Sequence, residues 1–130
     1  MTSTHEYLYE DLTNLIIKGF YRVYNTLGYG FSKMIYTKAL EIEFEKMGLI
    51  VEQNKFVMMY YETKEIGEHR LEFVINNCVL VEIETGDNTI SEEGYRLYSH
   101  LKISKYRVGL LLYFGKSQAE IIRREYTAKI

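Results

Sequence analysis

Two glutamates, Glu82 and Glu84, alternate with the apolar residues Val81 and Ile83 in a run rich in valine. Because successive side chains of a β-strand point to opposite faces, both carboxylates are expected on the same face of a sheet. Sites built from oxygen ligands alone suit Mg²⁺ or Mn²⁺. The run therefore predicts either a divalent metal site or an exposed row of glutamates on a solvated sheet face.

A third carboxylate, Glu72, precedes them, and its place depends on the turn that follows. A two-residue turn puts Glu72 on the face opposite to Glu82. A three-residue turn at residues 76–78 pairs Ile75 with Val79 and sets Glu72 directly opposite Glu82. Three carboxylates at such short distances raise one another's pKa unless a cation or a basic side chain lies among them.

Helical periodicity in the first third of the chain predicts two helices that could supply such a side chain. The first is expected from about Tyr9 to Leu27, before a left-handed glycine stop at Gly28. The second ends at Gly48, and its inward face begins with Lys33. The remaining positions of that face are apolar: Tyr36, Leu40, Phe44 and Met47.

The rest of the chain switches to the pattern of strands. Runs of Val, Ile, Phe and Tyr predict strands at residues 49–53, 56–61, 70–75 and 78–84. Thr89 and Glu92 form a capping box for a helix that ends near Ser104, and strands follow at residues 108–114 and 120–126. The order α, α, β, β, β, α, β, β predicts an α/β fold in which helices flank both faces of a mixed sheet.

Composition limits the class of protein. A chain of 130 residues with 47% hydrophobic and 26% charged residues fits one globular domain, residues 1–130. The single cysteine, Cys78, excludes an internal disulfide and a cysteine zinc cage. Without a leader or an apolar run of about 20 residues, we expect an intracellular, cytoplasmic protein with no membrane partner.

Charge and aromatic content favour two kinds of partner. Residues 62–93 carry nine acidic and two basic side chains, and residues 95–130 carry eight basic and two acidic ones. Such blocks fit a cation site beside a phosphate-binding surface, or else solvated helices and hairpins. The 13 tyrosines suggest stacking on bases or a surface for a homodimer or another protein, although half-buried tyrosines are common in cores.

The histidines, His5, His69 and His100, are not at ligand spacing in the sequence. We expect His100 to be a polar residue at the edge of the core rather than a general base. No Ser/His/Asp set and no phosphate-binding glycine loop is evident.

The sequence from about Leu12 to Arg124 resembles the GxxExxY family of the PD-(D/E)xK nuclease superfamily. Three blocks carry the resemblance in register: LTNLIIKGFYRVYNTLGYGFSKMIYTKAL, RLEFVINNCVLVEIE, and LYSHLKISKYRVGLLLYFGKS with IIRR after it. Gly30 and Tyr36 stand at the ends of the naming motif. Glu72 stands at the aspartate position and Glu82 at the acidic position of the (D/E)xK pair. The resemblance implies a restriction-endonuclease-like αβα sandwich and a nuclease activity that depends on Mg²⁺ or Mn²⁺.

The departures from the family pattern fall on the site itself. Lys33 stands where the naming motif has glutamate, Glu84 where the pair has lysine, and Arg96 where the following helix has glutamine. Tyr24 stands at a position that is often histidine. The first two departures form a reciprocal exchange of acid and base between a helix and a strand.

This pattern has two interpretations. In the first, the protein is a metal-dependent phosphodiesterase of nucleic acid, with Glu72 and Glu82 as metal ligands, Lys33 and Glu84 as catalytic partners and Arg96 as a phosphate contact. In the second, Lys33 and Arg96 neutralise the three acids. The protein is then a catalytically inactive module of the same fold that binds protein or nucleic acid.

Overall fold

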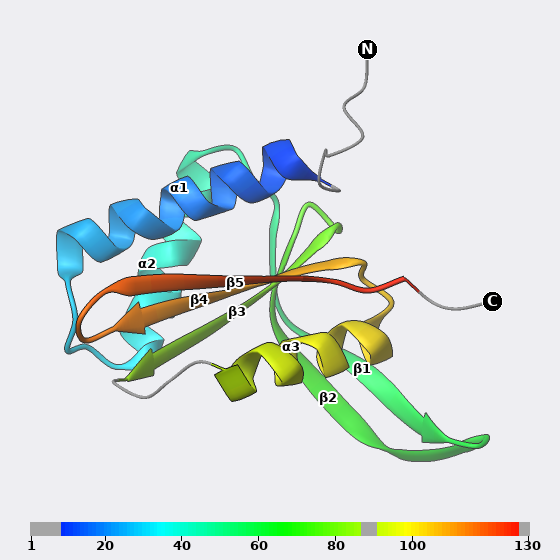
Figure 1. Ribbon diagram of the computed structural model, residues 1–130. Coiled ribbons are helices and arrows are strands. Elements are labelled where there is room, and N and C mark those ends of the chain that lie inside the picture. Colours follow the sequence, from blue (N-terminus) through cyan, green and yellow to red (C-terminus); the bar gives the residue numbers. More distant parts are fainter. Residues whose placement is uncertain (1–8, 87–90, 128–130) are drawn as a thin grey trace.

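The computed structural model describes residues 9–86 and 91–127, which form eight helices and strands (Figure 1). Their order confirms the predicted one: α1 (Glu10–Leu27), α2 (Lys33–Lys46), β1 (Val51–Tyr61), β2 (Lys64–Ile75), β3 (Val79–Gly86), α3 (Ser91–Ser104), β4 (Val108–Gly115) and β5 (Ala119–Glu125). Thr89 of the predicted capping box and His5 lie outside the described residues. None of the helices described is long and apolar enough to cross a membrane.

The sheet has the spatial order β1-β2-β3-β4-β5 and is mixed. β3 and β4 are parallel, and the other neighbouring pairs are antiparallel. Parallel neighbours need a crossover connection, which here runs through α3. α1 and α2 lie on one side of the sheet and α3 on the other, as Figure 1 shows. The predicted α/β sandwich of the restriction-endonuclease type is confirmed.

Two apolar clusters hold these layers together. The larger one packs α1 and α2 on the sheet around Phe20, Tyr36 and Phe114. The smaller one packs α3 on the other face through Leu97 and Leu101. All of β4 is buried, since it lies between β3 and β5 and contributes residues to both clusters.

The ribbon formed by β1 and β2 is longer than predicted. The runs expected at 49–53 and 56–61 are one strand that continues through Asn54, which has a φ of 55°. The four predicted runs therefore form the three strands of the predicted order. β2 begins at Lys64 rather than near residue 70. Residues 64–69 lack apolar alternation, so pairing with β1 rather than burial places them in the sheet. Figure 1 shows the outer part of this ribbon extending away from the body.

The connection from β2 to β3 is the three-residue turn. Asn76 and Asn77 both have positive φ, and Ile75 pairs with Val79. Cys78 therefore lies in the turn instead of opening the strand. The regular pairing between β2 and β3 ends at Phe73 and Val81, one residue before Glu72 would meet Glu82.

Candidate functional site

The backbone of β2 is irregular at Glu72. Leu71 packs in the cluster beneath α3, whereas Phe73 packs in the cluster beneath α1 and α2. Residues two apart in a regular strand share a face, so β2 must rotate between them. On β1 the facing residue is Asn54, which is the one with positive φ. Glu72 thus lies where β2 twists and leaves β3.

The carboxylate of Glu72 is held by two donors. Its Oε1 lies 2.8 Å from Nζ of Lys33, and its Oε2 accepts a hydrogen bond of 3.4 Å from the backbone N–H of Ile83. That N–H belongs to β3 just past the point where pairing with β2 ends. Burial raises the pKa of Glu72, and the lysine and the hydrogen bonds oppose this effect. The side chain is 14% exposed, so it titrates in a largely dry environment.

Lys33 connects Glu72 with Glu84. It lies at the start of α2, and its Nζ is 3.5 Å from Oε1 of Glu84. A cation at a helix N-terminus gains nothing from the helix dipole, so these carboxylates supply its favourable contacts. The two residues of the reciprocal exchange therefore meet in space.

Glu82 lies apart from this pair. It is buried and contacts Nδ1 of His100 on α3. The burial of Glu72 raises its pKa, and the charge of Glu82 adds to this effect. The three acids are divided between two sets of partners: Lys33 for Glu72 and Glu84, and His100 for Glu82.

His69 joins Glu82 and His100. One potential ligand atom from each of the three residues lies within 4.8 Å of the others. The two imidazole rings lie with centroids 3.9 Å apart, and Nε2 of His69 is buried without a hydrogen-bond partner among the described residues. Burial lowers the pKa of His69, and the neighbouring His100 lowers it further. Within residues 9–86 and 91–127, this is the one group of three or more such side chains that could hold a single ion.

Spacing in the sequence did not indicate that His69 and His100 lie together in space. They are 31 positions apart in the sequence, and the unexpected length of β2 and the position of α3 bring them together. His100 follows the buried Leu97 by three residues, so helical spacing could have indicated that it faces the sheet. Nothing in the sequence indicated His69.

Arg96 and Tyr24 lie outside both groups. Arg96 is exposed on α3 and forms no ion pair with any acidic residue that the structure describes. Tyr24 donates a hydrogen bond of 2.7 Å to the carbonyl of Gly115 and so ties α1 to the end of β4. Among the basic side chains predicted for the site, Lys33 is the one that contacts its acids.

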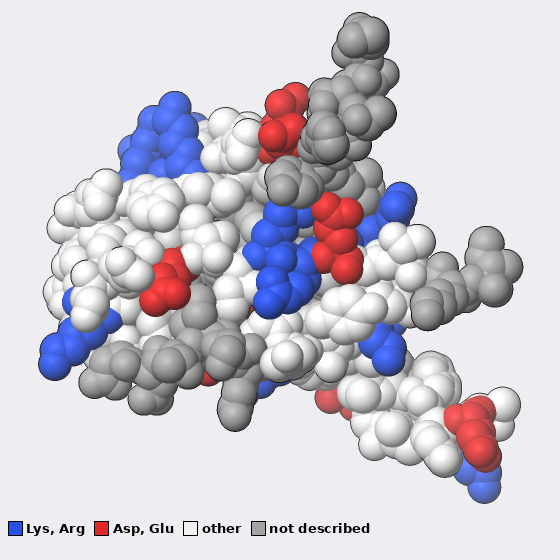
Figure 2. All heavy atoms as spheres, in the orientation of Figure 1, with Lys and Arg blue, Asp and Glu red and all other residues white. Residues whose placement is uncertain are grey.

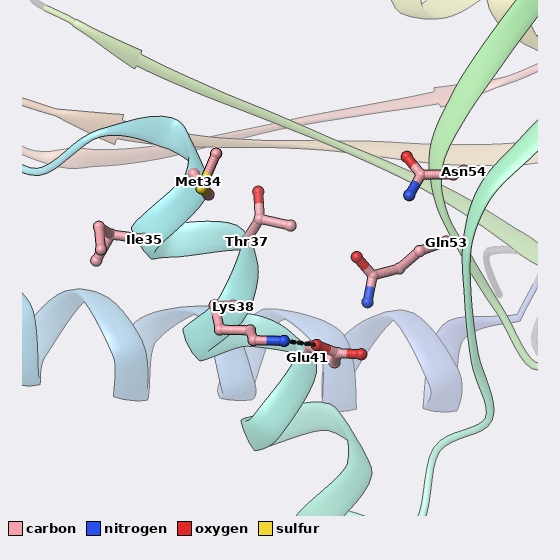
Figure 3. A pocket seen from close by; sticks show the side chains of 7 residues that line it. All are labelled: Met34, Ile35, Thr37, Lys38, Glu41, Gln53 and Asn54. Carbon is pink, nitrogen blue, oxygen red and sulfur yellow. Dashed lines mark hydrogen bonds and ion pairs between the residues drawn. The ribbon is translucent and has the colours of Figure 1, made fainter.

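A surface hollow of about 500 Å³ adjoins this region between α2 and β1 (Figure 3). Figure 3 shows Gln53 and Asn54 pointing from β1 toward α2, where Lys38 and Glu41 form an ion pair of 3.5 Å. Neither the three acids of the predicted site nor His69 and His100 line it. The hollow touches the site only through Asn54, which faces Glu72 across the ribbon.

The charged surface is mixed on the face shown in Figure 2. Basic and acidic side chains lie next to one another near the middle of this face, and again at the tip of the β1–β2 ribbon. The acidic and basic blocks of the sequence are therefore not separated into two single-sign surfaces on this side.

Comparison with known proteins agrees with this architecture. The chain matches the family model of the PD-(D/E)XK nuclease superfamily over residues 10–125, and it belongs to that superfamily. Nucleases of this superfamily generally use divalent metal ions. The narrower resemblance to the GxxExxY family stays a prediction.

A solved structure gives the same fold. The crystal structure of SSO0001 superposes with a TM-score of 0.58 at 16% sequence identity and covers 92% of this chain. The chain spans 60% of the length of that one, and at this identity the likeness is one of fold. No curated protein matches the sequence.

Proposed function

We propose that the protein is a divergent, metal-dependent nuclease of the GxxExxY type that hydrolyses phosphodiester bonds of nucleic acid inside the cell. One observation carries the proposal: Lys33 contacts Glu72 and Glu84 at the point where β2 leaves β3, the strand that also carries the buried Glu82. This contact supports the proposal, because it joins a lysine to two of the acids expected of a nuclease site, with lysine and glutamate exchanged between helix and strand.

The residues suit the roles that the reaction requires. Glu72 and Glu82 offer carboxylate oxygens for Mg²⁺ or Mn²⁺, which would lower the pKa of a nearby water and stabilise charge on the scissile phosphate. Lys33 orients that water or holds the phosphate, and Glu84, 32% exposed, accepts a proton. Arg96 is exposed on α3 and is free to contact a phosphate further along the substrate.

A second function has a specific observation in its favour. The ion pair of 2.8 Å between Lys33 and Glu72 neutralises the acid that would otherwise take a metal. In a catalytically inactive module, this pair is structural, and the protein acts through its surface. Exposed aromatic and apolar side chains on the β1–β2 ribbon offer such a surface to a protein partner or a second copy: Phe56, Tyr60, Tyr61 and Ile66.

Activity assays on single- and double-stranded DNA and RNA distinguish the two functions. With Mn²⁺ or Mg²⁺ we expect cleavage that EDTA abolishes and that Glu82→Gln and Glu72→Gln reduce at least 100-fold, as an order-of-magnitude expectation for removal of a metal ligand. Glu52→Gln is the matched control, because Glu52 is a sheet glutamate whose ion pair is with Lys55. Absence of cleavage by folded wild-type protein on every substrate would favour the inactive module.

A further inference from the structure

Three side chains from three different elements form a compact group of donor atoms on the α3 face of the sheet. His69 comes from β2, Glu82 from β3 and His100 from α3, and their donor atoms lie within 4.8 Å of one another. Ligand atoms about 2.0–2.1 Å from a tetrahedral ion lie roughly 3.3 Å apart. Small side-chain rotations are therefore enough to bring the three donors onto one ion.

The environment of the group favours an ion over an empty cluster. Nε2 of His69 is buried and has no hydrogen-bond partner among the described residues. A buried nitrogen without a partner is unfavourable, and coordination would satisfy it. The centroids of the two imidazole rings lie 3.9 Å apart, so their nitrogens can approach the same ion.

The donor set selects a class of metal. Two imidazole nitrogens and one carboxylate suit divalent transition metals, whereas Mg²⁺ prefers oxygen ligands throughout. Three protein ligands also leave a coordination position open, as in catalytic rather than structural zinc sites.

We propose that His69, Glu82 and His100 bind a divalent transition-metal ion of the Fe²⁺, Co²⁺, Ni²⁺ or Zn²⁺ class. This site differs from the all-carboxylate site of the proposed nuclease and does not depend on nuclease activity. Glu82 is the residue that the two sites share, so an ion here would lie next to Lys33 and its acids.

Titration with Co²⁺ tests the site directly. Untagged full-length protein, stripped with a chelator, is titrated with Co²⁺ and followed by visible d–d absorption, and Zn²⁺ binding is measured by calorimetry. We expect one ion per chain. His69→Gln and His100→Gln should each weaken binding at least tenfold, while Glu52→Gln, a sheet glutamate paired with Lys55, keeps the wild-type affinity. Failure of folded wild type to bind, or equal affinity in the histidine variants, would overturn the proposal.

A measurement on the wild type covers the case in which a histidine variant does not fold. X-ray absorption at the zinc edge should show two imidazole ligands, and a spectrum with oxygen ligands alone would refute the site. Loss of binding in Glu72→Gln but not in His69→Gln would also refute it, because the ion would then belong to the carboxylates. Cleavage assays report on the nuclease separately, so either proposal can fail without the other.

Discussion

At the scale of single residues, the exchange between Lys33 and Glu84 is the most informative feature of the site. Lys33 is 41% exposed but lies 2.8 Å from a carboxylate that is largely buried. Ion pairs at exposed positions contribute little, and those involving a buried partner contribute mainly by keeping that partner from being left alone. Removal of Lys33 should therefore destabilise the protein mainly because Glu72 loses its partner, and less because Glu84 does.

Charge reversal tests this contact. Lys33→Glu places three acids together, and we expect it to lower the free energy of unfolding by about 1–3 kcal/mol, with the exposure of Lys33 favouring the lower end. Glu84→Lys should also destabilise the protein. The double variant should recover part of the loss, with a coupling energy of at least about 0.5 kcal/mol in urea denaturation.

Lys38→Glu is the matched control for that cycle. Lys38 lies on the same helix, is 76% exposed and, among the described residues, forms its ion pair with Glu41 at 3.5 Å. Its reversal should change the free energy of unfolding by less than about 0.5 kcal/mol. Strict additivity of Lys33→Glu and Glu84→Lys would show that their contact has no energetic weight.

The histidines predict a pH dependence for metal-free protein. The pKa of His69 in the folded state is below its ordinary value of 6.5, so the unfolded chain binds more protons as the pH falls past that value. The free energy of unfolding of the wild type should therefore decrease as the pH is lowered through this range. The free energy of unfolding of His69→Gln should decrease less between about pH 7.5 and 5.5. Glu72 has the opposite effect on stability. Burial raises its pKa, so protonation at lower pH removes an unfavourably buried charge from the folded state. Both proteins keep Glu72, so parallel pH profiles would contradict the prediction.

At the scale of elements, the close approach of α3 to β4 positions His100. A Cβ atom on Gly109 would lie 2.9 Å from Cδ1 of Leu97 and 3.1 Å from Cδ2 of Leu101. Only glycine at this position of β4 lets α3 lie low enough on the sheet for His100 to contact Glu82. The same helix is the crossover between the parallel strands, so packing and topology together fix the histidine.

Gly109→Ala should separate this effect from general instability. The added methyl pushes α3 outward, and we expect a loss of about 1–3 kcal/mol in the free energy of unfolding. It should also weaken Co²⁺ binding, because His100 moves with the helix. Gly19→Ala is the control, since its Cβ would lie 3.0 Å from Phe44 in the other core, away from α3. Gly19→Ala should destabilise the protein and leave the affinity for Co²⁺ unchanged.

At the scale of the whole molecule, stability is unevenly distributed over the sheet. β4 is buried along its whole length between the two cores, whereas the outer half of the β1–β2 ribbon is exposed (Figure 1). Backbone hydrogen bonds that are covered on both faces open only with the entire fold, and those in contact with water open locally. The site lies at the boundary, where the ribbon twists away from the sheet.

Hydrogen exchange should reveal this gradient. Amides of β4 should exchange only through global unfolding, with a free energy equal to that from urea denaturation. Amides of residues 58–68 should exchange at lower free energy, because they lie in the exposed part of the ribbon. Equal protection of β4 and the outer ribbon, measured by mass spectrometry, would mean that the ribbon is held by contacts beyond those described.

Much of the architecture follows from the sequence because it rests on local pattern. The 3.6-residue period predicted α1 and α2 and placed Lys33 on the inward face of the second helix. The apolar run of residues 108–114 predicted the strand that became the buried β4. Side-chain alternation placed Glu82 and Glu84 on one strand face. The turn at residues 76–78 was one of two open choices, and each choice fixed a definite register.

The division of the site was decided only by tertiary structure. Alternation assumes a regular strand, but β2 rotates at Glu72, so that Glu72 points to Lys33 while Glu82 contacts His100. His69 reaches this group because pairing with β1 extends β2 beyond any apolar signal. Sequence periodicity reports which face a residue takes within its own element. Which elements bring their faces together depends on long-range packing, and this packing made a cluster of two histidines and a glutamate out of residues that are far apart in the chain.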